Sequence, residues 1–268
     1  MARTGATVCR PGIEIETYVD GDGPTLVILP SYGRGGGEDY DDITARTAQA
    51  GWQVLRPQPR GVAGSKGPMA GVTLHDLADD VAAVIENLGG GRAVLMGQAF
   101  GQALSRMVAT DHPNLVEAVV LAAAQASKVP PDIAATPFVA GDLTRPEADR
   151  LDALRQAFFA PGHDARPWLA GWHPETLKMQ HEAAKAVPLS AYWACGHAPV
   201  LEVFGAVDPF KPQAYWRELR DQFGDRVTSV VIEDASHALF PEQPDLVAQA
   251  VLPWLDQHRS AAMARDRS

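Results

Sequence analysis

The sequence predicts an α/β fold in which a mostly parallel sheet is covered by helices on both faces. Apolar runs of strand length alternate along the chain with segments whose apolar residues recur at helical spacing. Runs such as 25–29 and 93–96 are apolar without interruption, as in strands that are buried on both faces. One segment, residues 126–195, breaks the alternation and therefore predicts an insertion between two strands.

Each expected element follows from its local pattern. The expected strands are 13–19, 25–29, 53–56, 93–96, 116–121, 200–204 and 227–232. The expected helices are 39–50, 74–88, 99–110, 212–223 and 244–257. The helix over 74–88 has the clearest signal, because Leu77, Val81, Val84, Ile85 and Leu88 share one face at helical spacing.

The insertion carries half of the tryptophans in the chain, namely Trp168, Trp172 and Trp193. Open α/β sheets bind ligands beyond the carboxyl ends of their strands. We therefore expect residues 126–195 to form a helical cap (lid) over such a site, with the core made of residues 1–125 and 196–268. The three tryptophans are candidates for substrate contact, and a small helical domain with its own core is the alternative.

Composition narrows the class of protein. The chain has 268 residues, 46% hydrophobic and 21% charged, with a net charge of −10, which disfavours nonspecific binding to nucleic acid or anionic membranes. Its first residues lack the apolar run of a signal peptide, and no stretch approaches the roughly 18 apolar residues of a membrane span. Cys9 and Cys195 lie far apart, so a reduced, cytoplasmic setting is the simplest expectation, with a disulfide left open.

A short motif connects an apolar run to a helix. Gly97-Gln98-Ala99-Phe100-Gly101 has the form of the strand–turn–helix in which G-x-S-x-G presents a nucleophilic serine, but its middle residue has no hydroxyl. Asp208 follows the strand 200–204, and His237 lies in the loop after the last strand. The order of nucleophile position, acid and histidine is that of a Ser-Asp-His triad.

On these motifs the sequence resembles the α/β-hydrolase fold family over nearly the whole chain. The resemblance implies an eight-stranded, mostly parallel sheet with a helical cap. It assigns Asp208 as the triad acid, His237 as the base and Ala99 as the nucleophile position. The backbone N–H groups of Phe100 and Tyr32 become the oxyanion-hole donors.

Two regions depart from the family pattern besides Ala99. Pro30 and Ser31 stand where the family usually has His-Gly, so the Ser31 hydroxyl is a candidate hydrogen-bond donor to substrate, a nucleophile, or a loop residue only. Gln98 and Gln102 flank the elbow, and Gln98 is a candidate substrate contact. These departures favour natural divergence at Ala99, while an engineered replacement of a serine stays open.

Charged and ligand-like residues elsewhere have plainer interpretations. Arg34 and Arg60, in loops near the expected pocket, are candidates to bind an anionic substrate group. The run 33–38 lacks the third glycine of a nucleotide-binding loop. His181-Glu182-Ala183-Ala184-Lys185 begins like a zinc-protease helix but lacks the second histidine, and it predicts an exposed helix face. The sequence implies neither a metal nor an organic cofactor.

The expected function is that of an α/β-hydrolase-like enzyme acting on a small, partly apolar organic molecule, on a scaffold for ester or lactone hydrolysis. Serine-type hydrolysis should be very weak as the chain is written, because losing the nucleophile costs about a million-fold in rate. One alternative is His–Asp general-base chemistry without hydrolysis, as in a lyase, isomerase, cyclase or cofactor-free oxygenase. Another is a ligand-binding protein without turnover. The sequence determines neither the substrate nor the oligomeric state.

Overall fold

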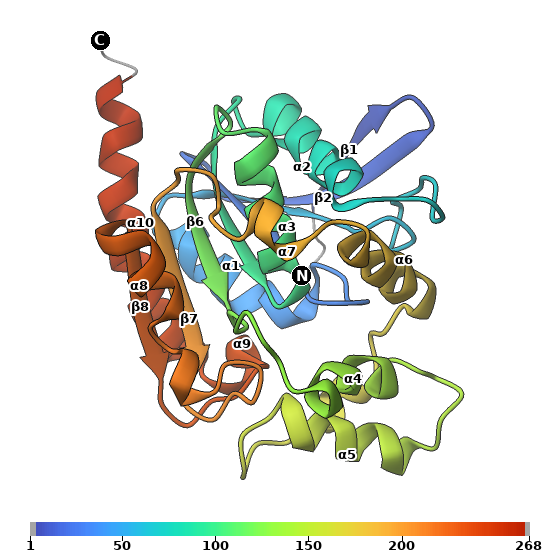
Figure 1. Ribbon diagram of the computed structural model, residues 1–268. Helices are drawn as coiled ribbons and strands as arrows, with labels where there is room; N and C mark the ends of the chain where they lie inside the picture. Colours follow the sequence, from blue (N-terminus) through green and yellow to red (C-terminus); the bar gives the residue numbers. More distant parts are fainter. Residues whose placement is uncertain (1–3, 266–268) are drawn as a thin grey trace.

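The computed structural model describes residues 4–265 and contains one eight-stranded sheet (Figure 1). The strands are β1 (Gly5–Arg10), β2 (Ile13–Asp20), β3 (Thr25–Leu29), β4 (Gln53–Pro57), β5 (Ala93–Gln98), β6 (Val116–Ala122), β7 (Val200–Gly205) and β8 (Val227–Ile232). Their order across the sheet is β1-β2-β4-β3-β5-β6-β7-β8. Only the pairs β1–β2 and β2–β4 are antiparallel, which confirms the mostly parallel sheet that the sequence predicts.

Helices cover both faces of this sheet. In the core they are α1 (Asp41–Gln49), α2 (Leu74–Leu88), α3 (Phe100–Asp111), α8 (Glu218–Phe223), α9 (Leu239–Glu242) and α10 (Pro244–Arg265). Successive strand residues alternate between faces: Leu29 packs in the cluster that holds α2 and α3, and Ile28 packs in the cluster that holds α1 and α10. Central strands are therefore apolar throughout, as the sequence pattern indicated.

The observed elements differ from the expected ones at α8 and at β1. The helix expected over 212–223 is interrupted, because a 3-10 turn at Gln213–Tyr215 precedes α8, which begins only at Glu218. The indole N–H of Trp216 donates to the carbonyl oxygen of Lys211 at 3.0 Å and holds the chain in this turn. The strand β1 was not predicted separately. It lies at the sheet edge and buries little besides Val8, so its sequence shows no apolar run.

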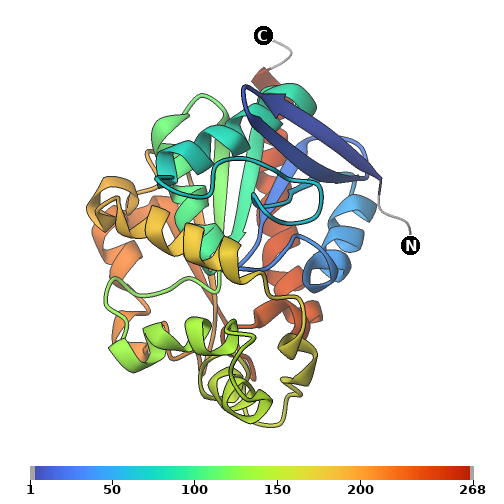
Figure 2. The ribbon, with the colours of Figure 1, turned by 90° about the vertical axis from the view of Figure 1, so that its right-hand side faces the viewer.

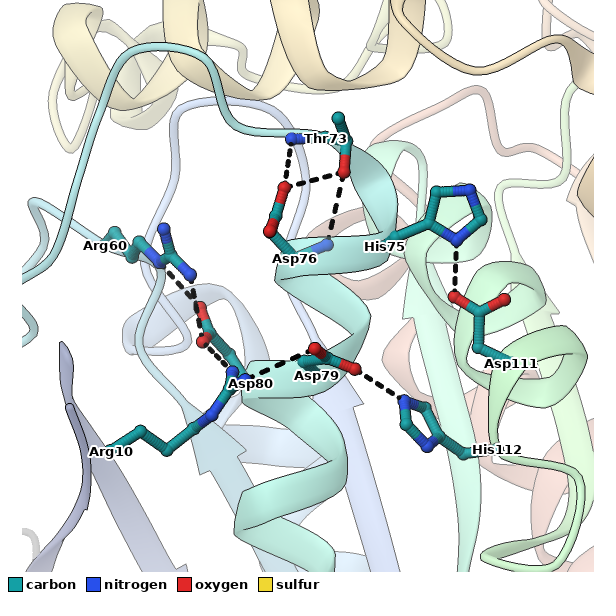
Figure 3. A network of polar contacts seen from close by, with 9 residues as sticks. All are labelled: Arg10, Arg60, Thr73, His75, Asp76, Asp79, Asp80, Asp111 and His112. Atoms are coloured by element: carbon teal, nitrogen blue, oxygen red, sulfur yellow. Dashed lines mark hydrogen bonds and ion pairs between the residues drawn. The ribbon is translucent and has the colours of Figure 1, made fainter. Parts of the chain in front are cut away.

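A polar network fixes the N-terminal half of α2 (Figure 3). Thr73 caps the helix in a reciprocal capping box with Asp76. Further along, Asp80 accepts from Arg60 at 2.7 Å and from Arg10 at 2.8 Å, and so links β1, α2 and the loop after β4. The acidic residues at this helix start thus serve capping and ion pairing.

The segment between β6 and β7 is helical. It contains α4 (Pro131–Ala140), α5 (Glu147–Ala157), a 3-10 turn (Arg166–Leu169), α6 (Pro174–Lys185) and α7 (Leu189–Tyr192). Figures 1 and 2 show α4 and α5 beyond the carboxyl ends of the parallel strands. In contrast, α6 packs against α2 and α7 against α3, and Met179, Ala183 and Tyr192 from these helices belong to the apolar cluster that holds α2 and α3. The division of the chain at residues 126 and 195 stays a prediction.

The two cysteines are unpaired. Cys9 is exposed on β1, whereas Cys195 is buried after α7, and both are free thiols. Burial raises the pKa of the Cys195 thiol, which disfavours its thiolate form. The disulfide that the sequence left open is therefore excluded.

Candidate active site

The turn between β5 and α3 places Ala99 at a strained position. Ala99 has φ 50° and ψ −110°, in the left-handed region where a side chain costs energy. Its N–H donates to the carbonyl oxygen of Ala122 at 3.1 Å, and its own carbonyl accepts from the N–H of Gln102 at 3.1 Å. The elbow geometry of a nucleophile position is thus present, with a methyl group in place of the hydroxyl.

The two glycines of the elbow are required by close packing. A Cβ atom on Gly97 would lie 2.0 Å from the carbonyl oxygen of Gly101. A Cβ atom on Gly101 would lie 2.1 Å from the carbonyl oxygen of Leu29. Since the obstructing atoms in both cases are backbone atoms, no side-chain rotation can relieve the contact.

Replacing Gly101 with alanine should therefore destabilise the fold strongly. The new methyl group has to push α3 away from β3, and we expect a loss of about 3 kcal/mol in the free energy of unfolding. Gly5→Ala on β1 is the matched control, because its added Cβ would meet no atom nearer than Oε1 of Glu16 at 3.4 Å, an ordinary contact distance. Urea denaturation of both variants measures the difference, and equal stabilities would contradict the assignment.

His237 and Asp208 form a buried hydrogen-bonded pair. Nδ1 of His237 lies 2.8 Å from Oδ2 of Asp208, and each residue is only 3% exposed. Oδ1 of the same carboxylate accepts the N–H of Phe210 at 2.8 Å, which fixes its orientation. A carboxylate only accepts, so the Nδ1 proton points to Asp208 and Nε2 is the nitrogen available to a ligand.

The imidazole of His237 is held from two further sides. Its ring stacks on Phe210 with centroids 4.0 Å apart, and the Phe158 ring lies edge-on at 5.6 Å. Behind it, the Gln98 amide donates to the carbonyl oxygen of His237 at 3.1 Å and accepts from the Tyr40 hydroxyl at 2.7 Å. Gln98 therefore ties the elbow strand to the histidine loop and does not line the cavity described next.

A cavity of about 210 Å³ joins the elbow, the loop after β3 and the histidine. Of the residues predicted for the site, it brings together Ser31, Tyr32, Ala99, Phe100 and His237. Its other walls come from the end of β6, the insertion and the loop after β7: Gln125, Val129, Ala134, Pro137, Phe138, Phe158, His181 and Phe210. Asp208 stands behind His237, outside the lining.

The loop that follows β3 is held by the insertion. The N–H of Gly33 donates to the Gln180 side chain at 2.7 Å, and its carbonyl accepts from the N–H of His173 at 2.7 Å. The Ser31 N–H donates to the Tyr40 hydroxyl at 3.1 Å. Among residues 4–265, the N–H groups of Tyr32 and Phe100 donate to no other group, so both remain available to a substrate oxygen.

The arginines predicted to bind an anionic substrate are committed elsewhere. Arg34 pairs with Asp39 at 2.6 Å and lies over the rings of Trp168 and Trp172, at 4.4 and 5.3 Å. Arg34 and Trp168 line a different, open cavity of about 690 Å³. Arg60 pairs with Asp80 at 2.7 Å.

Trp193 is also placed away from the candidate site. Its ring packs under the guanidinium of Arg106 at 4.2 Å, and its N–H donates to Gln222 at 2.8 Å. Arg106 is buried, and its Nε–H donates to the side-chain oxygen of Gln102 at 2.8 Å. The unusual residue Gln102 thus has a structural role, and its presence says nothing about the chemistry at Ala99.

Sequence reasoning missed several cavity residues. His181 lies on an exposed helix face, as expected, but its ring also contacts Phe138 at 4.6 Å and lines the cavity. Gln125 follows the carboxyl end of β6, which is the sheet edge where ligand-binding residues gather. That position was a usable signal, whereas the positions of Phe138 and Phe158 depend on how the insertion folds.

Glu242 braces the histidine loop. Its carboxylate accepts the N–H groups of Ala160 and Ser236, at 2.6 and 2.9 Å. Burial raises the pKa of this carboxyl above its ordinary value of 4.5, although the two hydrogen bonds oppose the rise. Glu242 thereby joins the insertion to the residue that precedes His237.

The raised pKa of Glu242 predicts a stability that falls with rising pH. The folded chain keeps this proton to higher pH than the unfolded chain, so the contribution is present below 4.5 and lost as pH rises through the folded pKa. Glu242→Gln lacks this term. The free energy of unfolding of the variant minus that of the parent should therefore increase as the pH rises above 4.5 and through the folded pKa. Urea titrations across this range test it, with exposed Glu147→Gln as the control; a constant difference would contradict it.

The described part of the chain lacks two features of other protein classes. Within residues 4–265, no group of three His, Cys, Asp or Glu side chains is placed to hold a metal ion. No helix in the same range is both long and apolar enough to cross a membrane.

Comparisons with known proteins agree on the fold. A family model described as the alpha/beta hydrolase fold matches residues 24–160. Similar solved structures include an esterase from Thermogutta terrifontis (TM-score 0.79, 20% identity, 97% of this chain and 100% of that one) and a hydrolase from Pseudomonas aeruginosa (0.76, 22%, 95% and 99%). A proline iminopeptidase from Mycobacterium smegmatis is also similar (0.73, 23%, 97% and 100%). No curated protein sequence matches the chain significantly.

Proposed function

Because the chain belongs to the α/β hydrolase fold family, we propose that it is a hydrolase-like enzyme for a small, partly apolar molecule of the ester or lactone type. In this proposal the 210 Å³ cavity is the active site and residues 126–195 form the cap over it. His237 is the general base, and Asp208 orients it. The N–H groups of Tyr32 and Phe100 are the oxyanion donors.

One observation carries the proposal. The His237–Asp208 hydrogen bond of 2.8 Å directs Nδ1 away from the cavity, so that Nε2 is the nitrogen that meets a ligand beside Ala99 and the free N–H groups. A histidine with its tautomer fixed by a buried carboxylate is suited to take and return one proton. Hydrolysis of a carbonyl compound needs such a base together with donors for the developing oxyanion.

The absence of a hydroxyl at position 99 defines the mechanism. Nε2 of His237 accepts a proton from a water molecule as that water attacks the substrate carbonyl carbon. The carbonyl oxygen becomes an oxyanion, which the N–H groups of Tyr32 and Phe100 stabilise. When the tetrahedral intermediate collapses, the protonated imidazole gives its proton to the leaving oxygen, so no acyl-enzyme forms.

The similar structures support the class of reaction. Their printed names describe an esterase, a hydrolase and a proline iminopeptidase, which are all hydrolytic enzymes. Their identity to this chain is at most 23%, so they support the scaffold and the reaction class and leave the substrate to the cavity residues.

Removal of His237 tests the proposal. On a panel of activated short-chain esters and lactones, we expect His237→Ala to reduce turnover by about a hundredfold, the usual contribution of a general base. Asp208→Asn should reduce it as well, because the amide can no longer fix the tautomer. His75→Ala, on the exposed face of α2, is the control. Turnover that is unchanged in His237→Ala would refute the assigned base.

A second candidate is general-base chemistry without hydrolysis. The observation that favours it is Ala99 itself, because the strained elbow persists at φ 50° although it presents no nucleophile. In such a reaction His237 would abstract a proton from an acidic O–H or C–H, and the same N–H groups would hold the resulting anion. Loss of His237 would abolish this reaction too, whereas a serine at position 99 would not accelerate it.

A further inference from the structure

Resting on the function proposed above, we infer that the cavity binds an uncharged molecule built on a single aromatic ring, and that Gln125 and His181 select the polar substituent on that ring. The cavity is the one lined by Ala99, His237 and the loop residues Ser31 and Tyr32. Its charge, walls, volume and free polar groups each point to this ligand.

The cavity lining contains no permanently charged side chain to pair with a charged ligand. Its lining residues include no aspartate, glutamate, lysine or arginine. Arg34 lines the other cavity and is already paired with Asp39 at 2.6 Å. Removing a charge from water without a counter-charge is strongly unfavourable, so both carboxylate and ammonium ligands are disfavoured here.

Aromatic rings form two groups in the wall. In the first, the rings of Tyr32 and Phe100 lie 4.7 Å apart, and Phe138 lies 6.1 Å from Tyr32. In the second, Phe158 and Phe210 lie 5.8 Å apart, and both contact the His237 ring. Edge-to-face and offset contacts with such rings favour an aromatic ligand over a saturated ring of equal size.

The volume limits the ligand to one ring with a short substituent. An apolar protein cavity of about 150 Å³ accepts benzene. The cavity here measures about 210 Å³, which leaves room for a small carbonyl-bearing group beside a single ring. The carbonyl would lie at the N–H groups of Tyr32 and Phe100, next to His237.

Two polar groups remain for the rest of the ligand. Gln125 is half-buried, and within the described chain its amide forms no hydrogen bond. An amide both donates and accepts, so it can bind a ring hydroxyl. His181 projects from α6 into the same lining, with its ring edge-on to Phe138 at 4.6 Å. These two side chains are therefore placed to hydrogen-bond to a polar substituent on the ring.

Equilibrium binding tests the inference without requiring turnover. By titration calorimetry at pH 8 on the chain as it stands, we expect acetophenone to bind and cyclohexyl methyl ketone to bind roughly fivefold more weakly. 4-Acetylbenzoate should bind at least roughly tenfold more weakly than acetophenone, because its carboxylate finds no cation. 4′-Hydroxyacetophenone should bind more tightly than acetophenone.

Variants assign the selectivity to its residues. Gln125→Leu should abolish the advantage of the hydroxylated ketone by removing its hydrogen-bond partner, while acetophenone still binds. His181→Leu, at an exposed position that tolerates substitution, should reduce the same advantage. Gln257→Leu, on the exposed face of α10, is the matched control and should leave all four affinities unchanged.

The outcomes separate this inference from the proposed hydrolysis. Equal affinity for the aromatic and saturated ketones, tight binding of 4-acetylbenzoate, or an advantage that survives both Gln125→Leu and His181→Leu would each overturn it. Binding as expected without ester turnover would support the ligand class and refute hydrolysis. Turnover of saturated esters with no aromatic preference would support hydrolysis and refute the proposed ligand class.

Discussion

Ala99→Ser should raise the rate of hydrolysis of activated esters by about a thousandfold or more. The elbow already holds residue 99 at φ 50° in the same cavity lining as His237, Tyr32 and Phe100, so the serine hydroxyl needs no new backbone geometry. Loss of this hydroxyl from a complete triad costs about a million-fold in rate, and restoring it should recover a large part of that factor. Initial rates and the acyl-enzyme burst with p-nitrophenyl acetate measure the gain.

The double variant Ala99→Ser/His237→Ala is the control for this gain. Because nucleophile and base act as a unit, the double variant should fall back to the rate of the parent chain. A folded Ala99→Ser variant with neither burst nor increased rate would show that the remaining site is not built for acyl transfer. The non-hydrolytic general-base reaction would then be the better account of His237.

Lys211→Ala should lower the free energy of unfolding by about 3–5 kcal/mol. Nζ of Lys211 lies 2.8 Å from Oε1 of Glu202, and neither side chain is exposed. Truncating the lysine leaves the Glu202 carboxylate buried without its counter-charge, since its other partner is the neutral hydroxyl of Ser229 at 3.1 Å. The backbone N–H of Lys211 donates to the backbone carbonyl oxygen of Asp208 at 3.1 Å. The loss of stability is therefore centred beside the His237–Asp208 pair.

Two comparisons make this prediction specific. Lys66→Ala removes an exposed ion pair with Glu14 and should cost at most about 1 kcal/mol. Replacing Lys211 and Glu202 with methionine removes the buried Glu202 charge and should restore most of the stability that Lys211→Ala loses. Glu218, which lies 3.6 Å from Nζ of Lys211, keeps its hydrogen bonds from Ser127 in either variant. Urea denaturation of the three variants measures these differences in the free energy of unfolding. A double variant no more stable than Lys211→Ala would assign the cost to packing instead of charge.

The core of the fold was predictable because its signals are local. The uninterrupted apolar run of β3 and the helical spacing in α2 each identify an element without reference to the rest of the chain. The edge strand β1 lacked such a signal, since its stability comes from pairing with β2 rather than from burial. The break before α8 depends on the Trp216 hydrogen bond to Lys211, which no periodicity predicts.

The residues of the candidate site also fall into those that local sequence signals predict and those that they do not. The motif around Ala99 and the placement of Asp208 and His237 after strands were readable, and the structure brings the last two within 2.8 Å. The roles of the insertion residues were not readable, because they depend on which helix packs where. Trp193 follows α7 onto the core and meets Arg106, whereas His181 reaches the cavity from α6.

The attachment of Gly33 to the insertion has a consequence for protein engineering and for evolution by segment exchange. The acceptor for its N–H is Gln180, and the donor to its carbonyl is the N–H of His173. A Cβ atom on Gly33 would also lie 2.7 Å from Cβ of Leu177, so loop and helix fit together closely. A transplanted segment between β6 and β7 would thus alter the loop after β3 as well as the walls of the cavity that the insertion supplies. The insertion and the loop at residues 30–34 therefore have to change together in this chain, and replacing one requires compensating changes in the other.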